Sequence, residues 1–483
     1  MHFQTRFVFK QSAIYGVGNV LTKLSGVILI PLYLNYINES EFGIVTLFET
    51  IFQFILMLSG LGVKGGFTRW YHEMENREQK RKLFFTTWSF NALTSLMAVL
   101  IVGLILQFFS SAIFKYELPN DLILYFLIGT FFRLMYDVPF YLLKLEQRAA
   151  SQTWWLVLNI TLMLGFTFYF LEYKKMGLKG IYLAQMIAHV LTFLAMIPLI
   201  LNNIKIGFLR GVLKQLINYG FPLAVSNVLT TVLTLSDRHI INQYQNLDEV
   251  AGYSMAFKVA NLVQMIVVAS LVTSYSNYFF KTMHERDSMA FFARFTRLFV
   301  ILITFGGLGI VLFSPEIIYV ISSGSSFFQS SVVLIPVLMA GLIFSGLRQL
   351  LTLPLNMHKK TKRISLILIL SAVVNIVGNF ILVPEYGKMG ASVSTVAAQL
   401  FGLIWIIVEV KRYESINLKL VKSFWLLVFW GVMVVIGMQT FAFDLPLGWL
   451  LKILVVLVFS AFMFLMGLIT REDLQTAWRF FKK

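Results

Sequence analysis

The chain has 483 residues, of which 58% are hydrophobic, 16% aromatic and only 13% charged. Soluble globular proteins carry about 25% charged residues, so this composition excludes a water-soluble enzyme, a disordered protein and a nucleic-acid-binding domain. The formal net charge of +17 and the absence of cysteine fit a membrane protein whose cytoplasmic loops face anionic lipid and which has no disulfide or thiolate metal site.

Fourteen apolar segments are long enough to cross a hydrocarbon core of about 30 Å. We expect helices, because a closed barrel would show short alternating strands with polar lumen positions. The paired short segments at 154–171 and 178–201 are the weakest two. In chain order the predicted spans are roughly 12–34, 42–63, 83–109, 119–140, 154–171, 178–201, 213–236, 250–279, 293–313, 331–352, 363–383, 389–409, 421–440 and 447–469.

The distribution of Lys and Arg predicts the orientation of these spans. With the N-terminus inside, 29 of the 40 basic residues fall in segments facing the cytoplasm, and only 7 fall in outer connections. Since cytoplasmic loops carry the excess of basic residues, both termini are expected in the cytoplasm. Three lysines at 174, 175 and 179 are the local exception.

The chain also contains an internal repeat. Six groups of residues recur in the same order 204 to 215 positions later: Asn-Val-Leu-Thr at 19–22 recurs at 227–230, and Arg133 recurs as Arg348. Repeats of six spans enter the membrane in the same orientation, and transporters place the substrate site between such halves. We therefore expect an all-α polytopic membrane protein with 14 transmembrane helices. Two parallel six-helix repeats, 1–208 and 209–411, would surround a central cavity, and 412–483 would add two helices and a cytoplasmic tail.

Ionisable side chains inside a span cost at least about 2.5–3.5 kcal/mol, so each is a candidate functional residue. Lys23 lies about 16 Å into the first span, near the bilayer midplane. Asn19 shares its helix face, and the repeat mate Asn227 heads a polar stripe that ends at Arg238. We expect these residues to line the cavity. The alternative is that Lys23 forms a structural ion pair with Glu49.

Arg133 and Arg348 are expected near the cytoplasmic ends of spans four and ten. They would either recruit an anionic headgroup from the inner leaflet or extend to the headgroups without a function. Asp137 follows Arg133 by four residues and is expected to pair with it, whereas Arg348 has no such partner on its helix.

Lys258 is placed about two turns below the outer end of its span, where it would either contact substrate or extend outward along its stem. Glu49, Asp137 and Asp237 are candidate coupling or structural acids. The excess of cations over acids inside the spans favours an anionic cargo. The sequence has no phosphate-binding loop and no His-Glu-x-x-His pair, so neither cofactor nor metal is expected and any coupling ion would be H⁺ or Na⁺.

Several motifs resemble those of a known family. The stretch from Phe7 to Asn19 ends in Tyr-Gly-x-Gly-Asn, the first span ends in Pro-x-Tyr at 31–33, and Glu-Phe-Gly at 41–43 opens the second. Lys-Met-Gly-Ala at 388–391 opens the twelfth. The chain resembles, over essentially its whole length, the polysaccharide-transporter (oligosaccharide-lipid flippase) family of the multidrug/oligosaccharidyl-lipid/polysaccharide (MOP) superfamily.

This resemblance implies movement of undecaprenyl-pyrophosphate-linked glycan repeat units, such as those of O-antigen lipopolysaccharide, capsule or exopolysaccharide, across the bacterial inner membrane by alternating access. The expected partners are the lipid-linked anionic oligosaccharide, membrane lipids and polysaccharide polymerase machinery, with no nucleic acid. The residues expected to bind substrate are Lys23, Asn19, Asn227, Lys258, Arg348, Arg133 and Arg238.

Other functions remain open at this point. A lipid II-type flippase also has fourteen spans, and a multidrug/cation antiporter of the same superfamily usually has twelve spans and buried acids. A polytopic glycan polymerase or glycosyltransferase would share the hydropathy. Such enzymes usually need a large outer loop or a carboxylate cluster, which this sequence lacks.

Overall fold

The computed structural model describes residues 29–272, 275–276, 288–358, 360–413, 420–443 and 446–468. All regular elements in these segments are helical. The chain divides into two compact units. Unit 1 contains the chain up to Ser254 together with Ile321–Ser323 and Asn379–Lys388, and unit 2 contains the rest.

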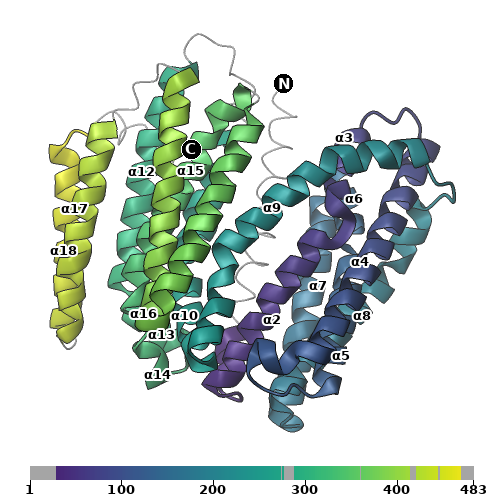
Figure 1. Ribbon diagram of the computed structural model, residues 1–483, viewed down its shortest axis with the longest axis horizontal. Coiled ribbons are helices and arrows are strands. Elements are labelled where there is room, and N and C mark those ends of the chain that lie inside the picture. Colours follow the sequence, from purple (N-terminus) through teal and green to yellow (C-terminus); the bar gives the residue numbers. More distant parts are fainter. Residues whose placement is uncertain are drawn as a thin grey trace. The chain divides into compact units, whose positions relative to one another are not determined.

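Unit 1 is a bundle of long helices, drawn in purple to teal in Figure 1. Its first described long helix starts at a capping box, in which the Asn38 side chain accepts from the Glu41 backbone and the Glu41 side chain accepts from the Asn38 backbone. The helices are α2 (Glu39–Leu58), α3 (Val63–Trp70), α4 (Arg77–Phe114), α5 (Asn120–Met135), α6 (Asp137–Leu145), α7 (Ala149–Phe168), α8 (Gly177–Asn203), α9 (Arg210–Tyr244) and the first part of α10 (Leu247–Ala260).

Two glycines allow the start of α9 to pack closely against the turn between α2 and α3. A Cβ added at Gly62 would overlap the carbonyl group of Gly220, and a Cβ added at Gly220 would overlap that of Gly62. Gly62 also has φ +80°, a conformation that favours glycine. One turn on, a Cβ at Gly66 would lie 2.9 Å from the Cα of Leu216. This glycine contact brings α9 against α3 and fixes one wall of the bundle.

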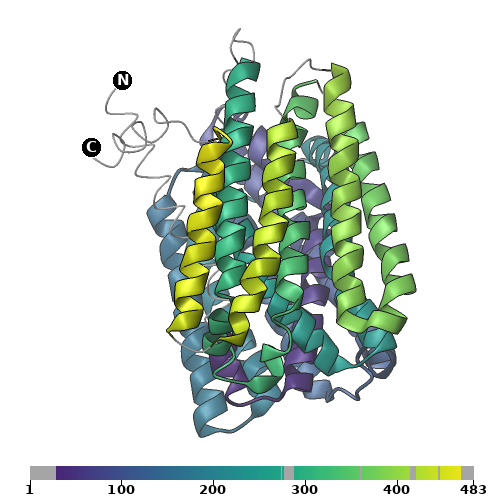
Figure 2. The same ribbon diagram turned by 90° about the vertical axis from the view of Figure 1, so that its left-hand side faces the viewer.

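Unit 2 contains most of the second half of the chain, drawn in green to yellow in Figures 1 and 2. Its last two helices lie side by side, with the rings of Phe429 and Phe462 stacked 3.8 Å apart. An ion pair between Lys452 and Glu316 connects α18 to α13. The helices are α12 (Ser288–Leu312), α13 (Ser314–Ile321), α14 (Ser326–Gln329), α15 (Leu334–Met357), α16 (Thr361–Tyr413), α17 (Leu420–Gln439) and α18 (Leu447–Leu465).

The long element α16 is a helical hairpin. Its helical geometry breaks at Gly387, where φ is +52°. Asn375 of the first arm donates to Thr395 of the second at 3.3 Å, and a Cβ at Gly378 would lie 2.9 Å from the Ser394 hydroxyl. The two arms therefore fold back on each other, as expected for the separate spans predicted at 363–383 and 389–409.

In the described part of the chain, 11 helices are long and apolar enough to cross a membrane, or 12 if the bent α9 is one span. These helices include Ala150–Tyr173 and Gly177–Asn203, which confirms the two weakest predicted spans. This count is lower than fourteen for two reasons. It takes the α16 hairpin as a single span. Residues 12–28, most of the predicted first span, lie outside the described residues. The total of fourteen and the repeat boundaries stay predictions.

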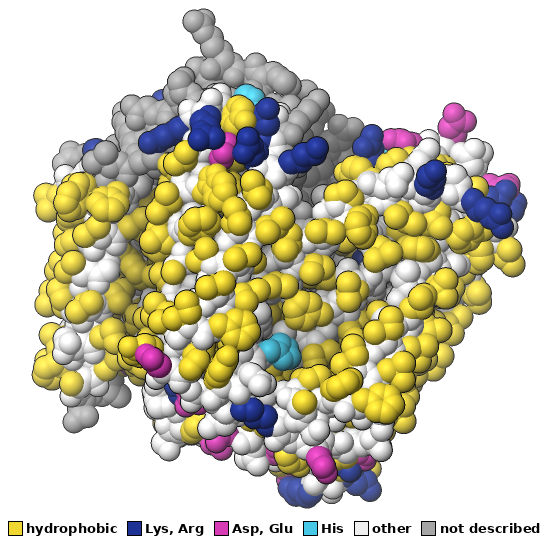
Figure 3. Space-filling model, viewed as in Figure 1, with side chains coloured by type: hydrophobic (Ala, Val, Ile, Leu, Met, Phe, Trp, Pro, Cys, Tyr) yellow, Lys and Arg dark blue, Asp and Glu magenta, His cyan; other side chains and the backbone are white. Residues whose placement is uncertain are grey.

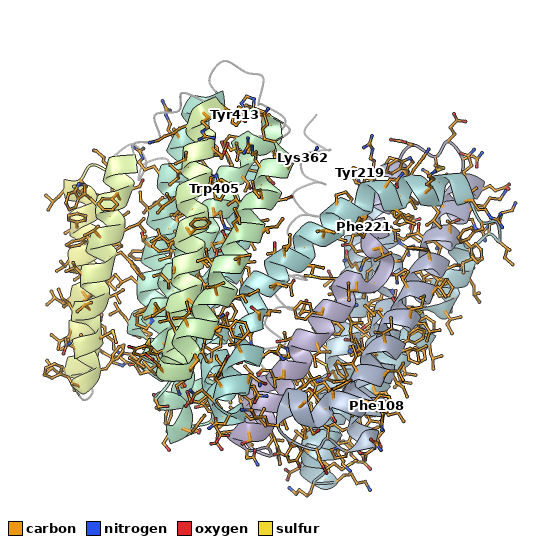
Figure 4. The ribbon with its side chains drawn as sticks, in the orientation of Figure 1. Phe108, Tyr219, Phe221, Lys362, Trp405 and Tyr413 are labelled. Atoms are coloured by element: carbon orange, nitrogen blue, oxygen red, sulfur yellow. The ribbon has the colours of Figure 1, made fainter. Side chains whose placement is uncertain are left out.

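The exposed surface has the character of a lipid-facing wall. Only 17% of the residues in the most apolar stretch of α4 are buried. Phe108 of this helix, labelled in Figure 4, is 74% exposed. Figure 3 shows hydrophobic side chains over the middle of the helices and charged side chains near their ends. Large continuous apolar surfaces of this kind are covered by lipid or by partners rather than by water.

Candidate functional site

The candidate site is a cavity of about 250 Å³ inside unit 1, here called the bundle cavity. Helices α2, α5, α7 and α8 supply most of its wall. It combines aromatic rings with polar side chains, as ligand pockets commonly do. Its polar and aromatic lining includes Tyr33, Phe48, Glu49, Phe52, Tyr125, Thr130, Arg133, Tyr136, Asn159, Tyr182, Gln185 and His189.

Arg133 supplies the positive charge of the cavity wall and belongs to a three-residue ionic cluster. Its Nη1 lies 2.6 Å from Oδ1 of Asp137, and Nζ of Lys64 lies 2.9 Å from Oδ2 of the same carboxylate. The Arg133–Asp137 pair expected from the four-residue spacing is therefore confirmed. Two cations share one carboxylate, so the cluster has a net charge of +1.

The cavity wall also carries a network of hydrogen-bonding groups that starts at Tyr136, whose ring centre lies 4.9 Å from the guanidinium carbon of Arg133. Nδ1 of His189 lies 2.8 Å from the Tyr136 hydroxyl and 3.2 Å from the Asn159 amide nitrogen, which also donates to Thr192 at 2.9 Å. The Gln185 amide donates to the Tyr33 hydroxyl at 3.3 Å. Because these partners hold one another in place, the wall presents oriented amide, imidazole and phenol groups to the cavity.

Glu49 gives the cavity one acidic group, and its side chain is exposed rather than buried. The site therefore offers a guanidinium, a carboxylate, amides and aromatic faces to a polar ligand of modest size. No cluster of three or more His, Asp or Glu residues that could hold a metal ion occurs in the described part of the chain.

Arg133 lies farther from the end of its helical segment than the predicted span implied. The sequence placed it near the end of a span at 119–140, but α5 and α6 together form one membrane-crossing segment, Asn120–Leu145. Arg133 is near the middle of that segment, twelve residues or about 18 Å of helix from Leu145. The helical segment continues past the expected end at residue 140, and the Arg133 side chain lines the bundle cavity. Its place near the headgroups stays a prediction.

Arg348 in unit 2 also lies farther from the end of its helix than the predicted span implied. Helix α15 continues to Met357, nine residues beyond Arg348, and the arginine is only 5% exposed. Its Nη2 donates to Gln399 at 3.3 Å, and its Nε has no hydrogen-bond partner among the described residues. Its stem packs over Gly402, where a Cβ would lie 3.0 Å from the Arg348 Cδ. Among the described residues no carboxylate forms an ion pair with this guanidinium.

The predicted polar residues of α9 have different environments. Asn227 is exposed, whereas Asp237 and Arg238 are 0% and 4% exposed. Asp237 accepts from the Tyr253 hydroxyl at 2.5 Å and from the Asn379 amide at 2.6 Å, and Nε of Arg238 donates to Ser254 at 3.0 Å. These two charged residues are thus buried and hydrogen-bonded within unit 1.

Three further predicted residues complete the set. Lys258 lies on α10 of unit 2 and is partly buried. Lys23 and Asn19 lie outside the described residues. Of the whole predicted set, the structure brings Glu49 and Arg133 to one cavity, with Asp137 bound to Arg133.

The sequence analysis missed four residues of this site. Asn159, Gln185 and His189 are isolated polar residues in apolar spans, a pattern that buried structural residues also show. Lys64 was counted among the basic residues of a cytoplasmic loop, but its side chain is only 14% exposed and bound to Asp137. The available signal was the spacing of Gln185 and His189, which are four apart and therefore share one helix face.

Comparison with known proteins gives the following matches. A family model described as "Polysaccharide biosynthesis protein" matches residues 8–283, and one described as "MatE" matches residues 222–381. No curated protein matches the sequence.

The fold is similar to that of several solved structures. The lipid II flippase MurJ in an inward closed conformation matches with a TM-score of 0.73 and 16% identity, over 94% of this chain and 99% of that chain. An inward-facing multidrug resistance MATE family transporter of the MOP superfamily matches with a TM-score of 0.63 and 14% identity, over 83% and 96%. A variant of the Vibrio cholerae MATE transporter VcmN gives a TM-score of 0.57 and 12% identity, over 86% and 98%.

Proposed function

The chain belongs to the polysaccharide biosynthesis protein family, within the MOP superfamily, and we propose that it is a flippase for polyprenyl-pyrophosphate-linked oligosaccharide. In this proposal the glycan and its pyrophosphate cross from the inner to the outer leaflet of the bacterial inner membrane, with both termini of the protein in the cytoplasm. The family membership supports the class of cargo, and the shared fold supports a transporter rather than an enzyme.

The observation that carries the proposal is an excess of cations over their carboxylate partners among the described residues inside the spans. Arg348 is 5% exposed, and no described carboxylate pairs with it, while Lys64 and Arg133 share a single carboxylate. A buried cation without a counter-charge is costly, so retaining one is favourable where an anionic ligand supplies the missing charge. A pyrophosphate is suited to this role because it accepts several charge-assisted hydrogen bonds.

The proposed mechanism is alternating access between two six-helix repeats around a central cavity. Lys23 would bind phosphate there, and Asn19 and Asn227 would contact polar headgroup atoms. Arg348 and Arg133 would attract the headgroup, and Lys258 and Arg238 are further proposed contacts. The polyprenyl tail would stay in lipid throughout.

The bundle cavity suggests where coupling would act. Glu49 and Arg133 line the same cavity, and Asp137 pairs with Arg133. Binding or release of H⁺ or Na⁺ at these acids would change the charge that the cargo meets. We therefore propose Glu49 as the first acid to test for ion coupling.

A second candidate is a lipid II-type flippase. The specific observation in its favour is coverage, since the MurJ structure matches 94% of this chain whereas the MATE structure matches 83%. Lipid II is also a polyprenyl-pyrophosphate-linked saccharide, so the two candidates differ in glycan and not in the chemistry of the anionic group.

The test is translocation in proteoliposomes. Fluorescent undecaprenyl-pyrophosphate oligosaccharide and fluorescent lipid II are reconstituted separately, and exposure to an impermeant quencher reports the leaflet occupied. We expect the protein to accelerate exchange of the oligosaccharide-linked lipid and Arg348→Gln and Lys23→Ala to slow it. The matched control is Lys179→Gln, because Lys179 forms an ion pair with Asp121 in which both side chains are more than 40% exposed.

Each outcome decides between the candidates. Faster exchange of lipid II alone would favour the second function, and exchange of neither lipid would contradict both. Full activity in both Arg348→Gln and Lys23→Ala would remove these cations from the proposed mechanism.

A further inference from the structure

A second cavity, of about 310 Å³, lies at one end of unit 1 and is separate from the bundle cavity. It forms where the segment after α3, the first turns of α4, the end of α6 and the end of α8 meet, at the upper right of Figure 1. We call it the basic cavity. Its lining residues are Tyr71, Glu75, Asn76, Arg77, Lys80, Arg81, Phe84, Leu142, Glu146 and Asn203.

Three cations from the start of α4 enter this cavity. Arg77, Lys80 and Arg81 have spacings of three and four, which place them on one face of the helix. No carboxylate of the described residues lies within ion-pair distance of any of the three. The next residue, Lys82, pairs with Glu78 at 2.8 Å, and Lys205 pairs with the same carboxylate at 2.9 Å. The Glu78 carboxylate thus pairs with cations beside the cavity, whereas the three cations that line the cavity form no ion pair with a described residue.

The Arg81 guanidinium has one nitrogen bonded to the backbone and one buried nitrogen without a hydrogen-bond partner among the described residues. Its Nη2 donates to the backbone carbonyl of Ile204 at 2.8 Å, which fixes the guanidinium. Its Nε is buried and has no hydrogen-bond partner among the described residues. An unsatisfied buried donor costs about 1–3 kcal/mol, a cost that a phosphate oxygen bonded to this nitrogen would remove.

The two carboxylates that line the cavity, Glu75 and Glu146, form no ion pair with its three cations. Glu146 accepts from the Tyr71 hydroxyl at 3.3 Å and lies 3.5 Å from Nη1 of Arg148, outside the cavity lining. Burial together with Glu146 raises the pKa of Tyr71 to about 12, so its phenol stays protonated and continues to donate. Glu75 is exposed. The lining as a whole has three cations against two carboxylates.

We propose that the basic cavity binds a phosphate group through Arg77, Lys80 and Arg81. Guanidinium groups match the geometry of phosphate oxygens, and the positive end of the α4 helix dipole adds to the attraction. Because α4 is a membrane-crossing helix and the cavity surrounds its first residues, the source that fits is the headgroup of an anionic phospholipid. A soluble phosphate compound is the other source of the same chemistry.

Binding is measured on the full chain in nanodiscs, and no transport step is needed, so the result is independent of the proposed function. One arm titrates inorganic phosphate and pyrophosphate into discs of phosphatidylcholine by calorimetry. The other arm uses discs that contain phosphatidylglycerol and counts retained lipid by native mass spectrometry. We expect retained phosphatidylglycerol in the second arm. Saturable binding in the first arm alone would assign the cavity to a soluble phosphate compound.

Two variants test the residues. Arg77→Gln removes a side chain that forms no hydrogen bond or ion pair with another described residue, so the fold should survive, and we expect about a tenfold loss of binding. Arg81→Lys keeps the charge but removes the Nε donor, and we expect a smaller loss. Lys82→Gln is the matched control, since Lys82 lies on the same turn but outside the cavity.

Thermal unfolding of each variant verifies that the chain is folded. The proposal is overturned if neither probe binds the unaltered protein, or if Arg77→Gln and Lys82→Gln reduce binding equally.

Discussion

The carboxylate of Asp137 is the only described acid that pairs with Lys64 and Arg133, so its loss would leave two poorly exposed cations uncompensated. We expect Asp137→Asn to lower the free energy of unfolding by about 3 kcal/mol, the lower end of the range for breaking a buried ion pair because Arg133 retains some exposure. Chemical denaturation in detergent measures this loss.

The control for that variant is Glu73→Gln. Glu73 and Arg69 also form an i, i+4 pair, but both side chains are 55% exposed, and exposed pairs contribute about 0–1 kcal/mol. Adding Lys64→Met to Asp137→Asn should recover part of the stability. Equal effects of Asp137→Asn and Glu73→Gln would show that the ionic cluster does not stabilise unit 1.

Arg348 should behave in the opposite way, because no carboxylate of the described residues forms an ion pair with it. Replacing a buried charge by an apolar residue of similar length is commonly neutral or stabilising by about 1–4 kcal/mol. We therefore expect Arg348→Met to be at least as stable as the unaltered chain in thermal unfolding while losing translocation. A large loss of stability would indicate instead that the guanidinium and its bond to Gln399 maintain the fold of unit 2.

The chemistry of individual residues was only partly predictable. The Arg133–Asp137 pair followed from a four-residue spacing, since helix geometry alone brings such side chains together. Asn159 and His189 meet at the cavity, and Lys64 meets Asp137 beside it, only because three different helices pack together. No periodicity within a single segment carries that information.

At the scale of elements, the contact between Gly62 and Gly220 gives a sharp prediction. A methyl group at Gly220 would overlap the backbone of Gly62, and backbone cannot yield as a flexible side chain does. We expect Gly220→Ala to destabilise unit 1 by about 1–3 kcal/mol, the usual cost of overpacking, as measured by thermal unfolding in detergent.

Gly165 in α7 provides the matched control. It is also a helical glycine, but a Cβ there would meet nothing within 4 Å. Gly165→Ala should be neutral or should stabilise by up to about 1 kcal/mol, because alanine favours the helix. A Gly220→Ala variant as stable as Gly165→Ala would contradict the close approach of α9 to the turn before α3.

Elements were more predictable than sites because span length is a property of the local sequence. Hydropathy predicted α7 and α8 despite their weak signals, and the two arms of α16 match two predicted spans separated at Gly387. The predicted end of the fourth span, residue 140, differs from the observed helical segment, which continues to Leu145. Hydropathy finds the segment that must be buried, whereas the end of a helix depends on what packs around it.

At the scale of the whole molecule, both units present apolar walls with charged side chains concentrated near helix ends, which fits burial in a bilayer. Aromatic residues occur at such ends: Tyr413, labelled in Figure 4, lies at the end of α16 with Nζ of Lys360 at 4.9 Å from its ring centre. Tyrosine beside lysine is typical of the membrane interface, and the basic partner favours the cytoplasmic side. The predicted orientation therefore places this end inside.

The lack of cysteine makes that orientation directly testable, because any single introduced cysteine is the only thiol in the chain. Glu73, in the basic segment before α4, is predicted to face the cytoplasm, and Ser330, directly after α14, is predicted to face outward. Both residues are exposed. We expect an impermeant maleimide to label Ser330→Cys in intact cells, and to label Glu73→Cys only after permeabilisation. Labelling in the reverse order would place both termini outside, and the basic cavity would then face away from the cytoplasmic leaflet whose anionic lipids are its expected ligands.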